Sequence, residues 1–140
     1  MAEETAIQDV LTAYSQSIGL RDLDMTMGTF MPDGIWELQG LGQKWQGRDA
    51  IREALTGIYS GMDYLVQINA PALIEVSGDT AKARYTVREC GRRSGTDQAF
   101  EAFGVYFDDL TKGPEGWQFV HHNFRMLAGQ TYTVGAPPTM

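Results

Sequence analysis

The spacing of apolar residues changes once along the chain, near Tyr64, and this change constrains the fold more than any other feature. Before it, three segments show the spacing of amphipathic helices: residues 5–19, 22–31 and 49–61. After it, four segments show the alternation of β-strands: residues 64–76, 80–92, 98–111 and 116–128. Helices followed by long antiparallel strands predict an α+β fold. We expect three N-terminal helices packed on a strongly curved, mainly antiparallel sheet, in the form of a cone-shaped barrel.

Local signals support the helical part of this prediction. Thr5 begins a capping-box pattern for the first helix, Asp22 is a candidate cap for the second, and Pro32 stops the second helix. Residues 35–38 and 43–46 are short, aromatic-rich runs that flank a glycine-containing turn, so they predict a hairpin between the second and third helices.

Length and composition bound the remaining possibilities. A chain of 140 residues with 43% apolar residues predicts one domain, here residues 1–128, followed by an irregular tail at 129–140. The single cysteine, Cys90, excludes an intrachain disulfide and favours a cytoplasmic location. The net charge of −7 disfavours nucleic acid and anionic membranes as partners, and no window reaches the ~18 apolar residues of a membrane span.

A strongly curved sheet wrapped around helices leaves a cavity, and strand alternation predicts which side chains face it. On residues 80–92, Ala81, Tyr85 and Val87 share one face with Glu89. We take this apolar face as the inner one. A carboxylate that faces a cavity pairs with a cation, stays protonated or takes part in catalysis, so Glu89 is a candidate catalytic residue.

The last strand carries two adjacent histidines, which alternation directs to opposite faces. Trp117 and Phe119 are the better core anchors, and the same parity turns His121 and Asn123 inward. His122 is then expected at the surface or in an interface. With an ordinary pKa of ~6.5, His121 is the candidate general acid or base. The competing interpretation is a hydrogen-bonded structural histidine.

Several aromatic and polar side chains are candidates to bind a small molecule in the cavity. A buried tyrosine hydroxyl needs a hydrogen-bond partner, and several such hydroxyls in one cavity would bind a phenol, enol or carbonyl oxygen. Each could instead be a packing residue. The candidates for substrate binding are Tyr14, Trp36, Tyr64, Gln67, Tyr85 and Tyr106, and Tyr59 joins them with a catalytic role.

The remaining patterns concern partners and cofactors. Both faces of residues 98–111 are apolar, which predicts a homodimer formed through the convex face of the sheet. Nucleotide-binding glycine motifs and histidine metal motifs are missing from the sequence. We therefore expect no cofactor and no metal.

Several segments together resemble the nuclear transport factor 2-like superfamily, in particular its SnoaL-like, scytalone dehydratase-like branch. They are FMPDGIW at 30–36, WQGRDAIREAL at 45–55, IEVSGDTAKA at 74–83, GVYFDDL at 104–110 and GWQFVHHNFRM at 116–126. Enzymes of this branch usually carry an aspartate after the first helix and a histidine on the first long strand. The corresponding positions here are Gly19 or Asp22, and Val66 or Gln67.

The resemblance implies a cofactor-independent lyase for a small aromatic or phenolic molecule. Dehydration, cyclisation and carbon-carbon cleavage, such as loss of formaldehyde from a diaryl diol, are all compatible with it. In this hypothesis His121 moves the proton, Tyr59 with Tyr14 or Tyr85 holds a substrate oxygen, and Asn123 or Gln67 orients the leaving group. The alternatives are a non-catalytic dimer that binds a hydrophobic metabolite, and a ketosteroid isomerase-like enzyme with Glu89 as its base.

Overall fold

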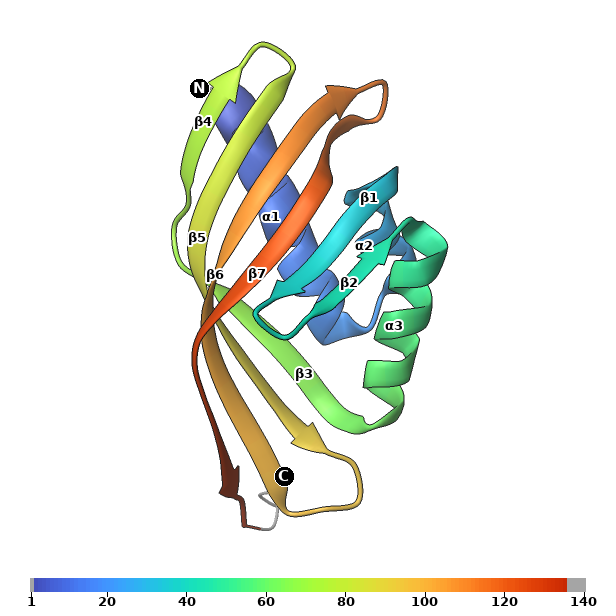
Figure 1. Ribbon diagram of the computed structural model, residues 1–140, viewed down its shortest axis with the longest axis vertical. Coiled ribbons are helices and arrows are strands. Elements are labelled where there is room, and N and C mark those ends of the chain that lie inside the picture. The colour runs from blue at the N-terminus through green and yellow to red at the C-terminus, as the bar shows by residue number, and fades with distance from the viewer. Residues whose placement is uncertain (1, 136–140) are drawn as a thin grey trace.

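The structure is a computed structural model that describes residues 2–135 (Figure 1). The helices are α1 (Ala2–Leu20), α2 (Leu23–Gly28) and α3 (Arg48–Ser60). The strands are β1 (Phe30–Gln39), β2 (Gln43–Gln46), β3 (Met62–Asn69), β4 (Leu73–Ser77), β5 (Thr80–Arg93), β6 (Gln98–Gly113) and β7 (Gly116–Thr133). The predicted order of three helices and a hairpin, followed by long strands, is confirmed.

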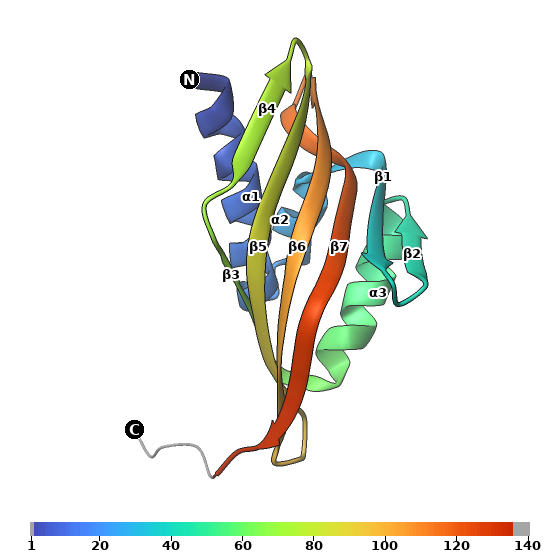
Figure 2. The same cartoon turned by 60° about the vertical axis from the view of Figure 1, so that its left-hand side comes forward.

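All the strands form one sheet, in the order β2-β1-β7-β6-β5-β3, with β4 also paired to β5. β1 and β7 run parallel, and the other pairs are antiparallel. The helices lie against the concave side of the sheet, which bends around them (Figures 1 and 2). This is the expected α+β cone, and its sheet remains open.

Short-range features explain where the helices begin. The Asp22 side chain accepts a hydrogen bond from the Met25 backbone N–H at 3.0 Å, which confirms the predicted cap of α2. α1 begins at Ala2, earlier than the predicted start near Thr5. Its buried stripe, which includes Ile7 and Leu11, packs in the hydrophobic core against the sheet.

The first long strand of the prediction is two strands in the structure. β3 and β4 are separated at residues 70–72, and they pair with successive parts of β5. Pro71 lies in this gap. Because proline has no backbone N–H to donate to a sheet, the break falls where the chain cannot continue a regular ladder.

An extra residue in β7 changes the inward and outward assignments along that strand. Phe119 pairs with Leu110 on β6 while His121 pairs with Asp109, so Val120 forms a bulge. Strict alternation is lost at this point, and both Phe119 and His122 are fully buried. The prediction that His121 is the inward histidine is therefore wrong.

The same strand is longer than its sequence pattern indicates. β7 continues to Thr133, and residues 129–133 pair with the beginning of β6. The predicted irregular tail is therefore wrong for residues 129–133, while residues 136–140 lie outside the described part of the chain. The extension arises from pairing with β6, a long-range interaction that local composition does not report.

Candidate functional site

A cavity of about 400 Å³ lies between α1, α3 and the concave side of the sheet. This volume suits a small organic ligand. Its walls are mainly aliphatic and aromatic, with contributions from Trp36 on β1, Leu55 on α3, and Phe124 on β7. The polar and charged residues among its walls are few: Tyr14, Gln43, Gln67, Glu89, Arg93 and Tyr106.

Glu89 is the carboxylate of this cavity, as the alternation on β5 predicts. Antiparallel pairing places Gln67 of β3 directly opposite Glu89. The Gln67 side-chain amide donates to Glu89 Oε2 at 2.6 Å, and it lies 3.3 Å from the Tyr106 hydroxyl as a second donor contact. Burial raises the pKa of Glu89, and the hydrogen bond from Gln67 offsets part of this increase. At a given pH, a larger fraction of Glu89 is therefore protonated than of an exposed glutamate.

Tyr14 and Tyr106 supply hydroxyl groups near the same carboxylate. Their rings meet edge to face with centroids 6.1 Å apart. Burial raises the pKa of both hydroxyls, and the negative charge of Glu89 raises it further. Both tyrosines therefore remain protonated at neutral pH, and the Tyr14 hydroxyl hydrogen-bonds to that of Tyr106, so the pair can donate to a ligand oxygen through Tyr106.

A buried network of His122, Asp108 and Tyr85 packs against Tyr106 on the core side. His122 Nδ1 lies 2.7 Å from Asp108 Oδ1, and the Tyr85 hydroxyl donates to Asp108 Oδ2 at 2.7 Å. All three side chains are buried in the core. The His122 ring also stacks on the Tyr106 ring, so this network restrains one wall of the cavity.

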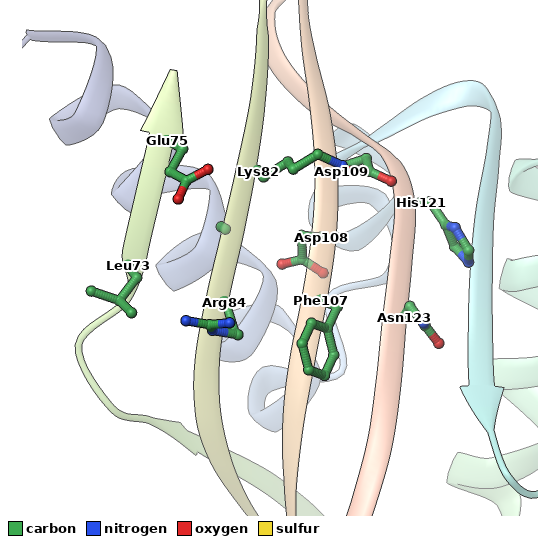
Figure 3. A pocket seen from close by; sticks show the side chains of 10 residues that line it. Leu73, Glu75, Lys82, Arg84, Phe107, Asp108, Asp109, His121 and Asn123 are labelled. Atoms are coloured by element: carbon green, nitrogen blue, oxygen red, sulfur yellow. Dashed lines mark hydrogen bonds and ion pairs between the residues drawn. The ribbon is translucent and has the colours of Figure 1, made fainter. Parts of the chain in front are cut away.

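The structure places His121 and Asn123 on the outer face of the sheet, away from the cavity. His121 Nε2 is 2.8 Å from Glu37 Oε1, and the Asn123 side-chain amide donates to Gln39 Oε1 at 3.1 Å. Figure 3 shows both residues at the edge of a shallow depression on this face. The bulge at Val120 is the physical reason why both inward assignments are wrong.

Three of the predicted tyrosines also lie outside the cavity walls. The Tyr59 hydroxyl donates to the Ile18 carbonyl at 3.1 Å, and burial raises its pKa to about 12. Tyr64 is 42% exposed, because it shares the outward parity of its β3 neighbours. The hydroxyl of Tyr85 is bound to Asp108 in the core.

Five of the predicted residues do line the cavity: Tyr14, Trp36, Gln67, Glu89 and Tyr106. The Trp36 ring stacks against Trp45 with centroids 4.5 Å apart, which holds the hairpin of β1 and β2 as one wall. These residues come from α1 and four strands. Strand pairing brings Gln67 beside Glu89, and the curvature of the sheet brings the more distant strands around the same cavity.

The sequence reasoning did not identify Asp108, His122 or Arg93 as part of the site. Asp108 has the inward parity of β6, in a row of mainly apolar residues. A carboxylate in such a row indicates a buried polar group, and the sequence pattern contains this signal. For His122, strict alternation predicts an outward side chain, because the bulge in β7 is not visible in the sequence. Arg93 shares the inward parity of Glu89 on β5 and Arg92 has the outward parity, so the alternation that identifies Glu89 also indicates Arg93.

The candidate positions for the aspartate and histidine of the resembling enzymes, Gly19 or Asp22 and Val66 or Gln67, carry neither residue as a cavity pair here. Asp22 is exposed and caps α2, while Gln67 lies in the cavity beside Glu89. Within residues 2–135 no group of three histidine, cysteine or acidic side chains could hold a metal ion. No helix in this range is long and apolar enough to cross a membrane.

A family model described as a SnoaL-like domain matches residues 1–123. The chain belongs to this family, which is part of the nuclear transport factor 2-like superfamily. No functionally curated protein is significantly similar to the sequence.

Solved structures of similar SnoaL-like architecture cover nearly the whole chain. A proposed scytalone dehydratase from Novosphingobium aromaticivorans has 24% identity and a TM-score of 0.86, over 96% of this chain and 91% of that one. A proposed aromatic ring hydroxylase from the same species also has 24% identity and a TM-score of 0.86, over 95% and 94%. A hexachlorocyclohexane dehydrochlorinase, LinA type 2, has 19% identity and a TM-score of 0.89, over 99% and 96%. At these identities the similarity shows the fold alone.

Proposed function

We propose that this protein is a cofactor-independent lyase that removes a proton from a small, mainly apolar, aromatic molecule held in the cone. The observation that carries the proposal is the Glu89 carboxylate beside Gln67 and Tyr106 in an otherwise apolar cavity. Burying a carboxylate in apolar surroundings is costly, and an elevated pKa is a frequent property of catalytic bases. Glu89 takes the role that the sequence pattern assigned to His121.

In this mechanism Glu89 removes a proton from a carbon atom of the substrate. The electron pair of the broken C–H bond forms a double bond as a hydroxyl group departs from the adjacent carbon. The proton now on Glu89 leaves with that hydroxyl group as water, so the carboxylate is regenerated. Gln67 favours the ionised form of Glu89 through its donated hydrogen bond.

Tyr14 and Tyr106 stabilise negative charge that develops on a substrate oxygen during proton removal. Their raised pKa values keep the hydroxyl protons in place, which is the state needed for hydrogen-bond donation. The same arrangement supports an isomerase as a second candidate. In that reaction Glu89 returns its proton to a different carbon and no group leaves.

The relatives lend support at the level of reaction type. One similar structure is a proposed scytalone dehydratase and another is a dehydrochlorinase, and both names describe eliminations. The Glu89 arrangement differs from the aspartate and histidine pair that the resemblance implies. We therefore propose elimination chemistry with a relocated base, acting on a substrate that is aromatic or phenolic.

The test is a cofactor-free incubation with phenolic and diaryl alcohols, followed by mass spectrometry. We expect loss of water or of a one-carbon fragment from one of them, and a decrease of at least ~100-fold in rate for Glu89→Gln. Glu115→Gln, in the exposed turn before β7, is the matched control. A product of unchanged mass would indicate the isomerase. Bound but unchanged compounds with both variants would indicate the non-catalytic binding protein.

We also propose that the protein is cytoplasmic and that it forms a homodimer, and the outer face of the sheet supports the dimer. Val66, Ile68, Phe103 and Phe107 are all exposed on this face. Some of the charged groups on this face pair with each other, as Lys82 does with Asp109 and Arg88 with Glu101. A face with exposed apolar side chains and partly neutralised charges is suited to a second copy of the same face.

A further inference from the structure

The opening of the cavity carries a positive charge. Arg93 is the last residue of β5, and it is exposed while also lining the cavity. Leu41 and Met126 are likewise exposed lining residues, which places the opening beside these three side chains. Within residues 2–135, Arg93 is the only cationic residue that lines this cavity.

The Arg93 guanidinium is also free of an ionic partner. Its neighbour Arg92 donates to the Thr96 carbonyl and lies 3.8 Å from Asp63. Other cations, such as Arg52 and Lys112, contact carboxylates directly. Within the described residues, no ion pair or side-chain hydrogen bond involves the Arg93 guanidinium. It can therefore pair with an anion that enters from solvent.

The two charges of the cavity are separated along one strand. The four residue steps from Glu89 to Arg93 along β5 correspond to about 13 Å between their Cα atoms. Gly91 lies between them, and the ring of Phe100 covers the place where a Cβ on Gly91 would stand, 2.5 Å from its Cε1. The path from the opening to the carboxylate is thus bounded by an aromatic wall rather than by polar groups.

This order of charges selects one orientation of a charged ligand. Glu89 repels an anionic group from the interior whenever its carboxylate is ionised, whereas Arg93 attracts an anionic group to the opening. Between them the walls favour apolar and aromatic surface. A ligand with an acidic group at one end and an aromatic body therefore binds with the acid outward and the body inward.

We propose that the substrate of this cavity is an aromatic carboxylate whose carboxyl group pairs with Arg93 while its aromatic body extends toward Glu89. The proposal rests on the cavity being the functional site and adds the chemical class of its ligand. A guanidinium is suited to this task because it binds a carboxylate through two parallel N–H donors. Arg93 is a binding residue in this proposal and takes no part in proton transfer.

The experiment compares two ligands that differ only in charge. Biphenyl-4-carboxylate and biphenyl-4-carboxamide are titrated into the protein, and affinity is followed by calorimetry and by intrinsic tryptophan fluorescence, to which Trp36 in the cavity wall contributes. We expect the carboxylate to bind at least ~10-fold more tightly than the amide at low salt. The preference decreases as the salt concentration rises, because Arg93 is exposed.

Variants of two arginines on the same strand provide the control. Arg93→Gln abolishes the preference, because it lowers the affinity for the carboxylate and leaves the affinity for the carboxamide unchanged. Arg93→Lys retains part of the preference. Arg84→Gln changes the same residue type on the outer face and leaves the preference intact. Equal affinity of both ligands for the wild-type protein, or an unchanged preference in Arg93→Gln, overturns the assignment to Arg93. If neither ligand binds, both this inference and the proposed role of the cavity are wrong.

Discussion

The imidazole ring of His122 lies face to face with the phenol ring of Tyr106, with centroids 3.8 Å apart and planes inclined by 13°. This contact connects the buried network of Asp108 and Tyr85 with the wall of the cavity. Tyr106 in turn contacts Gln67, which binds Glu89. The position of the carboxylate thus depends on a chain of contacts that begins in the core.

Removal of the buried histidine has a much larger effect on stability than removal of its neighbour. His122→Ala leaves a cavity and deprives the Asp108 carboxylate of a partner, so we expect the free energy of unfolding to fall by about 3 kcal/mol or more. His121→Ala removes a partly exposed contact with Glu37 and costs about 1 kcal/mol or less. Urea denaturation followed by circular dichroism measures both. Equal losses would contradict the inward position of His122.

Glu89 gives stability a specific pH dependence. Its pKa in the folded protein is raised above the ordinary value of 4.5, so folding favours the protonated form. The contribution of Glu89 is fully present below pH 4.5 and decreases as pH rises through the folded pKa. Glu89→Gln has no proton to lose and stays uncharged, so its free energy of unfolding relative to wild type increases over that range. Denaturation at a series of pH values tests this, and a constant difference would show that Glu89 is not perturbed.

The same group determines the pH dependence of turnover. A general base acts in its ionised form, so kcat/KM of the free enzyme rises with pH through the folded pKa of Glu89. Tyr14 and Tyr106 remain protonated across this range because burial raises their pKa values. A rate profile on the substrate identified by mass spectrometry checks the ascending limb. A rate that falls with pH from acidic to neutral conditions would assign Glu89 as an acid instead.

A close backbone approach at Gly104 supports the cavity wall. A Cβ at this position would lie 2.3 Å from two atoms of the Phe124 ring and 2.7 Å from the Arg125 carbonyl oxygen. We expect Gly104→Ala to destabilise the protein by about 1–3 kcal/mol and to weaken ligand binding, because Phe124 must shift. Gly113→Ala is the control, since nothing lies within 4 Å of its Cβ position. Thermal denaturation and ligand titration distinguish the two variants.

The proposed dimer predicts that one outer-face substitution changes the oligomeric state. Phe103→Asp introduces a charge among the exposed apolar side chains of the sheet, so we expect the protein to become monomeric. Leu20→Asp, which also replaces an exposed apolar residue but at the end of α1, should leave the dimer intact. Analytical ultracentrifugation measures the mass. A monomeric wild-type protein would refute the dimer without affecting the cavity.

Several features of the protein follow from local sequence alone. The change of period near Tyr64 predicts the order of helices and strands, and the Asp22 cap depends on a contact three residues away. The inward position of Glu89 follows from regular alternation along β5, whose pairing with β6 has no bulge. Where a strand has no bulge, the alternation of its sequence predicts which side chains face inward.

Other features depend on contacts between distant segments. The bulge at Val120 arises in the pairing of β7 with β6, and it exchanges the roles of His121 and His122. The Tyr59 hydroxyl is directed to the Ile18 carbonyl on α1, and the Tyr85 hydroxyl to Asp108 on β6. Alternation is a local property, whereas register and hydrogen-bond partners are set by neighbouring strands and helices. The sequence by itself therefore determined the fold and Glu89, and the tertiary structure decided which other groups surround that carboxylate.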